Sequence, residues 1–212
     1  MLAFFLATLA SLFSVVNPLG AVPMYLTLTA DHSPAENNLT ARKTAVYFAC
    51  ILLVFFFAGT LILSFFGISL DALRIAGGLI IVNSGYGLLN SKFVERRIDK
   101  KMQAEAVAKD DISFTPMAMP MLSGPGSISL LIGLYAAQAG WDRRLLIAGV
   151  VLMMAVLIYV TLRFAPLLFR VLGRAGLSAL SRIMGFLVMG IGIQMLIYGL
   201  ISLARQVYDS LG

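Results

Sequence analysis

An uncharged run at residues 2–30 is interrupted near its middle by the stretch Ser14-Val15-Val16-Asn17-Pro18-Leu19-Gly20. A helix rises about 1.5 Å per residue, so the 29 residues of this run exceed what a hydrocarbon core of roughly 30 Å requires. Proline removes a backbone donor and clashes with the preceding turn, and a neighbouring glycine tolerates non-helical dihedral angles. The stretch therefore predicts a membrane helix that is broken halfway.

A second overlong run, residues 112–141, carries a comparable interruption. It contains Pro116-Met117-Ala118-Met119-Pro120 followed by Ser123-Gly124-Pro125-Gly126-Ser127. Unwound backbone persists at bilayer depth only where protein or a water-filled cavity satisfies its polar groups. Two such breaks predict a polar cavity near the midplane of the membrane, and simple proline kinks are the alternative.

The remaining sequence has the composition of a membrane protein. Hydrophobic residues make up 60% of the 212 residues and charged residues only 12%, against roughly 25% charged in a soluble domain. Because a spanning helix needs about 20 apolar residues, we expect an all-α integral membrane protein with six transmembrane helices, of which the first and fourth are discontinuous. The uncharged runs are residues 2–30, 44–70, 75–91, 112–141, 145–162 and 183–204.

Several classes of function are disfavoured by what the chain lacks. The single cysteine, Cys50, lies in an apolar run, and the single histidine, His32, lies in a polar connection. All ten Asp and Glu residues lie in connections or at the ends of runs, so no carboxylate is placed as a proton relay within a span. We therefore expect no enzyme, no metal site, no cofactor and no nucleic-acid partner, and the residues leave open whether Na⁺ or H⁺ drives the protein.

Basic residues are distributed unevenly between alternate connections. Twelve Lys and Arg lie in the connections after the first, third and fifth runs, and four lie on the other side. The positive-inside rule then places both termini outside the cell and the 92–111 connection in the cytoplasm. Arg74 lies one turn inside the third run, where it either reaches the interface or pairs with Asp71.

Sliding the chain along itself by 107 residues superimposes Pro18 on Pro125, Gly78 on Gly185 and Gly85 on Gly192. Each half then contains three spans, so the second half enters the membrane in the opposite orientation. We expect an inverted 3+3 repeat, a design typical of secondary transporters, with the first repeat at 1–90, a connection at 91–111 and the second repeat at 112–212.

A broken helix can recognise a ligand without charged side chains. The half-helix that begins at a break presents free N–H groups, and the half-helix that ends there presents free carbonyl groups. A small zwitterion such as glycine, alanine or serine fits this pair of poles. Deep polar residues in other parts of the spans line the cavity or join helices. The candidate binding residues are Asn17, Pro18, Gly20, Ser123, Gly124, Pro125, Gly126 and Ser127, and the candidate cavity-lining residues are Ser14, Asn83, Ser84 and Gln194.

Five motifs, taken in order, resemble the MarC family, which includes the small neutral amino acid transporters called SnatA. They are Asn17-Pro18-Leu19-Gly20, Leu73-Arg74-Ile75-Ala76-Gly77-Gly78, the two proline-rich motifs at residues 116–126, and Ser181-Arg182-Ile183-Met184-Gly185. The resemblance covers nearly the whole chain. It implies a bacterial inner-membrane protein in which Asn17, Pro18, Gly20, Gly124, Pro125 and Gly126 bind a small neutral amino acid.

The function expected from these observations is a secondary carrier of small neutral amino acids that works by alternating access. Export from the cell is one direction of transport that fits this function. An exporter of other small metabolites or amphiphiles is the first alternative, and a channel is the second. The lipid bilayer and a zwitterionic substrate are the expected partners, and the residues do not indicate an oligomeric state.

Overall fold

A computed structural model describes residues 1–90 and 111–211 of the chain. In these residues the backbone is helical and contains no strand. Five helices are long and apolar enough to cross a membrane, or six if one bent pair counts as a single span. The predicted all-α membrane architecture is therefore confirmed, whereas nearly all of the predicted connection at 91–111 lies outside the described residues.

Residues 1–90 form four helices. The first overlong run forms α1 (Leu2–Val16) and α2 (Pro18–Leu28), which are followed by α3 (Pro34–Phe65) and α4 (Leu70–Leu89). A capping box starts α3, because the Ser33 side chain accepts from the Glu36 N–H and the Glu36 carboxylate accepts from the Ser33 N–H. The Ser69 side chain caps α4 in the same way, by accepting from the Ala72 N–H at 3.1 Å.

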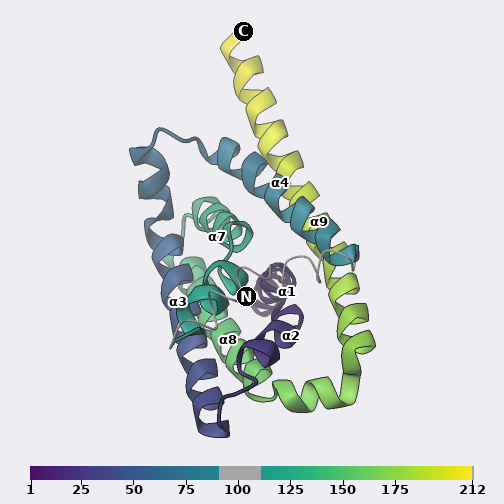
Figure 1. Cartoon of the computed structure of the whole chain (residues 1–212). Coiled ribbons are helices and arrows are strands. Elements are labelled where there is room, and N and C mark those ends of the chain that lie inside the picture. Colours follow the sequence, from purple (N-terminus) through teal and green to yellow (C-terminus); the bar gives the residue numbers. More distant parts are fainter. Residues whose placement is uncertain (91–110, 212) are drawn as a thin grey trace.

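Residues 111–211 also begin with a helix that is broken. An irregular helical segment, η1 (Ser113–Leu122), and α7 (Pro125–Ala137) meet at an angle of 62°. They are followed by α8 (Trp141–Arg163) and α9 (Ala165–Leu211). Gly173 interrupts α9 with a φ of 62° and a ψ of −177°, a conformation that side chains disfavour. The leg before Gly173 consequently turns sharply away from the long remainder of the helix (Figure 1).

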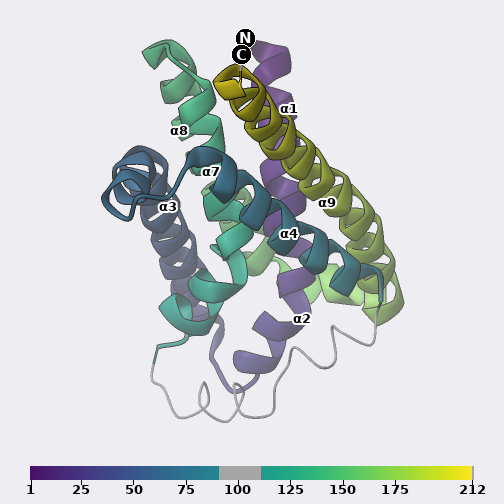
Figure 2. The same cartoon turned by 90° about the horizontal axis from the view of Figure 1, so that it is seen from above.

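Two helix pairs flank the broken helices. In Figures 1 and 2 the pair α3–α8 lies on one side, the pair α4–α9 lies on the other, and α1, α2 and α7 lie between them. The helices α3 and α8 pack on each other, and Phe48, Leu52 and Phe56 of α3 and Val151 and Met154 of α8 are all buried in the hydrophobic core. These residues recur every three or four positions, so each helix buries one face.

The opposite faces of the same helices expose large apolar side chains. Val54 and Leu61 on α3 are 59% and 70% exposed, and Leu152 and Val156 on α8 are 52% and 55% exposed. Apolar surface of this extent is costly in water and favourable against lipid. The two ends of the chain lie at the same end of the bundle (Figure 2).

Glycines bring the backbones of α4 and α9 together. A Cβ atom built on Gly78 would lie 2.8 Å from the carbonyl oxygen of Gly192, and one built on Gly192 would lie 2.8 Å from that of Gly78. Gly85 and Gly185 approach each other in the same reciprocal way, at 2.7 and 2.9 Å. Small residues permit this close contact between membrane helices, and any side chain at these positions would push the pair apart.

A polar cluster holds the beginning of α4 against α9. The buried Asp71 carboxylate accepts from the Arg74 guanidinium at 3.0 Å and from Ser202 and Gln206 of α9, each at 2.9 Å. The pairing of Arg74 with Asp71, which the sequence offered as one of two possibilities, is the one observed. Because charged groups inside the bundle need such partners, the cluster anchors the two helices to each other.

Candidate functional site

The first break consists of a single residue. Asn17 adopts a left-handed conformation with a φ of 48° and a ψ of 64°, which asparagine tolerates better than most residues. Its N–H donates to the carbonyl of Phe13 at 2.8 Å and ends α1, and its Oδ1 atom accepts from the Gly20 N–H at 3.2 Å and caps α2. Pro18 occupies the first position of α2, where its missing N–H costs nothing.

Gly20 makes room for the Asn17 side chain. A Cβ atom on Gly20 would lie 2.5 Å from Asn17 Nδ2 and 3.0 Å from Asn17 Cγ. A larger residue would therefore displace the Asn17 amide from its capping position. The motif that runs from Asn17 to Gly20 is thus explained locally by one left-handed residue, its cap and the space the cap requires.

The second break is more extended. Thr115 and Met119 interrupt η1 with extended backbone, at φ/ψ of −122°/122° and −131°/128°. Each precedes a proline, which disfavours the helical conformation for the residue before it. The chain then passes through Ser123 and the extended Gly124 before Pro125 begins α7. Both predicted interruptions of the helices are therefore present.

The N-terminus of α7 has free donors. Pro125 occupies its first position and brings no N–H, and no side chain among the described residues caps the first turn. The Ser127 hydroxyl donates to the Gly124 carbonyl at 2.9 Å. The N–H groups of the first turn therefore form the positive pole of the α7 dipole and favour an anionic partner.

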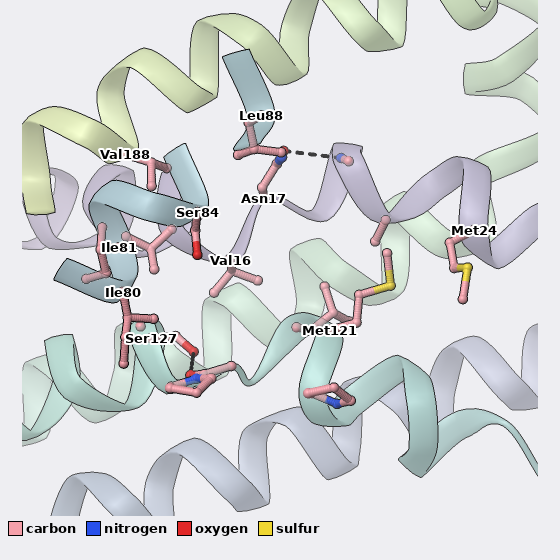
Figure 3. A pocket seen from close by; sticks show the side chains of 18 of the residues that line it. Val16, Asn17, Met24, Ile80, Ile81, Ser84, Leu88, Met121, Ser127 and Val188 are labelled. Atoms are coloured by element: carbon pink, nitrogen blue, oxygen red, sulfur yellow. Dashed lines mark hydrogen bonds between the residues drawn. The ribbon is translucent and has the colours of Figure 1, made fainter. Parts of the chain in front are cut away.

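A cavity of about 480 Å³ lies between the two breaks. Figure 3 shows Asn17, Ser84 and Ser127 around it, with the apolar side chains of α4 beside them. Among the described residues that line it, none is Asp, Glu, His, Lys or Arg, so this part of the chain offers the cavity dipoles in place of charged side chains. The lining residues are Val15, Val16, Asn17, Gly20, Ala21, Pro23, Met24, Ile80, Ile81, Ser84, Leu88, Pro116, Pro120, Met121, Leu122, Gly124, Pro125, Gly126, Ser127 and Val188.

Most residues singled out at the breaks meet at this cavity. Six of the eight candidate binding residues line it, namely Asn17, Gly20, Gly124, Pro125, Gly126 and Ser127. Pro18 is buried outside the lining, where it starts α2. Ser123 is 1% exposed and also lies outside the lining, and its hydroxyl has no hydrogen-bond partner in the described part of the chain.

The other deep polar residues lie in different surroundings. Ser84 lines the cavity, but Ser14, Asn83 and Gln194 do not. Ser14 is buried and donates its hydroxyl to the carbonyl of Ala10 at 2.9 Å. Asn83 and Gln194 lie on exposed faces of α4 and α9. Adjacent positions of a helix point about 100° apart, so Ser84 and Asn83 face different surroundings although they are neighbours in sequence.

Sequence reasoning missed the apolar part of the wall. Ile80, Ile81 and Leu88 surround Ser84 on α4, and Met24 lies one turn after Gly20 on α2. The signal was present in the helical spacing, because residues three and four positions from Gly20 and Ser84 share their faces. This spacing identifies the other wall residues of a helix only when one residue of that helix is already known to face the cavity.

Comparison with known proteins decides the family. The family model described as "MarC family integral membrane protein" matches residues 2–204. The chain belongs to the MarC family. It is 37% identical to a UPF0056 membrane protein of Methanocaldococcus jannaschii over 94% of this chain and 97% of that protein. No solved structure matches it.

Bacterial relatives are slightly less identical in sequence to this chain. The chain is 33% identical to the UPF0056 membrane protein YhcE of Escherichia coli, over 89% of this chain and 88% of that protein. It is 32% identical to the UPF0056 inner membrane protein MarC of Escherichia coli, over 93% and 94%. This chain is therefore a MarC-family integral membrane protein.

Proposed function

We propose that this protein is a secondary transporter of small neutral amino acids, of the kind represented by SnatA within the MarC family. The observation that carries the proposal is a cavity whose wall includes both helix breaks and whose described lining residues are all uncharged. Broken helices that surround a site at mid-membrane are characteristic of secondary transporters.

The dipoles at the breaks suit a zwitterion. The N–H groups in the first turn of α7, at Gly126 and Ser127, would receive the carboxylate. The carbonyl groups that end α1, together with the Asn17 amide oxygen, would receive the ammonium group. Such a site disfavours an ion that carries charge of one sign only, because that ion would leave one of the two poles without a partner.

We further propose that the two halves form an inverted repeat. The glycine contacts support it, because the shift of 107 residues converts the contact between Gly78 and Gly192 into the contact between Gly185 and Gly85. The helix pairs support it too, since α3 packs on η1 and α7 just as its counterpart α8 packs on α1 and α2. Pro18 and Pro125, which coincide in the shift, both occupy the first position of a half-helix.

Alternating access follows from this arrangement. The cavity extends along α2 and η1, whereas α1 and α7 contribute only the residues next to the breaks. Exchange of the conformations of the two halves would move the opening to the side of α1 and α7. The excess of Lys and Arg favours a cytoplasmic location for the α2–η1 side, so this conformation would be open to the cytoplasm and both termini would lie outside.

Counterflow in proteoliposomes tests the proposal. Vesicles that contain the purified protein are loaded with unlabelled alanine and diluted into labelled alanine. A carrier accumulates the label transiently because it exchanges one molecule for another. A channel equilibrates the label without accumulation, and an exporter of unrelated metabolites produces no exchange of alanine. Either of these results would contradict the proposed function.

A further inference from the structure

We propose that the cavity contains a subsite for an apolar amino acid side chain, so that its substrates include neutral amino acids as long as methionine and norleucine. This inference rests on the proposed function, because it assumes that the backbone of an amino acid binds at the helix breaks. It extends the substrate class beyond glycine, alanine and serine.

The volume of the cavity exceeds what the smallest substrates need. At roughly 30 Å³ for each water molecule in the liquid, the 480 Å³ of the cavity corresponds to about 16 water molecules. A bound glycine or alanine would leave most of this space to solvent. A longer side chain would occupy more of it and would displace water from apolar walls.

The serine hydroxyl groups and the methionine thioether groups of the wall lie at different ends, although apolar side chains of α4 also surround the serines. Ser84 and Ser127 lie at one end of the view in Figure 3, and the thioether groups of Met24 and Met121 lie at the other. The α2 and η1 helices that carry these methionines also contribute Ala21, Pro23, Pro116 and Pro120 to the lining. This apolar part of the wall, formed by Met24, Met121, Ala21, Pro23, Pro116 and Pro120, is called the thioether end below.

The composition of the thioether end indicates a ligand rather than a route for water. A passage for hydrated zwitterions gains from polar side chains, whereas none of these six residues has a polar side chain. Methionine side chains are flexible and polarisable and adapt to ligands of different shape. With the carboxylate at the first turn of α7, a side chain pointing toward α2 and η1 would meet this surface.

A homologous series of competitors tests the subsite in the wild-type protein. Alanine, 2-aminobutyrate, norvaline and norleucine each add one methylene group to the one before. Burial of a methylene group in an apolar site strengthens binding about fourfold. We expect the concentration that halves counterflow of labelled alanine to fall by about threefold to fourfold at each step, and labelled methionine to exchange as well.

Variants locate the subsite. Met121→Trp places a bulky ring at the thioether end and should lower the ratio of kcat/KM for methionine to that for alanine at least tenfold. Met24→Phe, on α2, should lower the same ratio. It tests the subsite if Met121→Trp does not fold. Met153→Trp is the matched control, because Met153 is 44% exposed on α8 and does not line the cavity.

The outcomes separate the two proposals. If alanine exchanges but inhibition weakens beyond alanine along the series, the subsite is refuted and the transport function stands. If methionine exchanges but neither variant changes the ratio, the thioether end is not the subsite and the inference is also refuted. If no amino acid exchanges, the proposed function itself fails.

Discussion

Replacement of Asn17 by alanine and by glycine separates the two roles that the structure gives this residue. Asn17 holds a left-handed backbone conformation and caps α2 through its Oδ1 atom. Alanine loses the cap, at a cost of about 1 kcal/mol, and must adopt a conformation that costs roughly 1–2 kcal/mol for a residue with a Cβ atom. Asn17→Ala should therefore destabilise the protein by about 2–3 kcal/mol.

Glycine behaves differently at the same position. It adopts left-handed dihedral angles freely, and replacement of a cap by glycine costs only a few tenths of a kcal/mol. Thermal unfolding in detergent measures the difference. At about 2–4 °C per kcal/mol for a chain of this size, we expect Asn17→Ala to lower Tm by about 4–12 °C and Asn17→Gly by about 1 °C.

Both variants remove the Asn17 amide from the cavity, so both should weaken binding. A hydrogen bond to a charged group contributes about 1.5–3 kcal/mol, so the Kd for alanine should rise about 10- to 100-fold in isothermal titration of either variant. Equal Tm values for Asn17→Ala and Asn17→Gly would refute the reasoning about the break. Unchanged alanine binding by the stable glycine variant would refute the role of Asn17 in recognition.

Three further changes test the contacts between α4 and α9 and the second break. Gly192→Ala places a methyl group 2.8 Å from backbone atoms of α4 and should lower the free energy of unfolding by about 1–3 kcal/mol in thermal unfolding. The control Gly190→Ala, whose new methyl group meets nothing within 4 Å, should be neutral or stabilising. Equal effects of the two variants would argue against the close contact between α4 and α9. Asp71→Ala removes the acceptor of three hydrogen bonds and leaves Arg74 unpaired, so denaturant unfolding should show a loss of about 3 kcal/mol, and a loss below about 1 kcal/mol would mean that the cluster does not anchor α4. Pro125→Ala supplies an N–H at the start of α7 and favours a continuous helix, so alanine counterflow should fall severalfold, and unchanged counterflow would make the break incidental.

Local chemistry explains why the breaks were predictable. The prolines at positions 18, 116, 120 and 125 act on the residues next to them, through a missing donor and a steric clash, whatever the remainder of the chain does. The detailed form of the first break was not predictable. The left-handed backbone of Asn17 becomes evident only from the observed dihedral angles and from the position of its amide against Gly20.

Polar residues within the spans show the limit of sequence reasoning. Asn83, Ser84 and Gln194 were equivalent in the sequence, because each is a polar residue deep in an apolar run. Only Ser84 lines the cavity. The glycine contacts between α4 and α9 determine which face of each helix points toward the other helix and which points toward the cavity. These contacts join residues about a hundred positions apart in the sequence.

The amino-acid sequence by itself determined that the chain is helical, that it lies in a membrane and that two of its helices are broken, because hydrophobicity and proline act over a few neighbouring residues. Only the tertiary structure decided which faces of the intact helices surround the breaks, how large the cavity between them is and that methionines form part of its wall. Those properties arise from packing between distant segments, and packing is a relation between helix surfaces that no single run of residues contains.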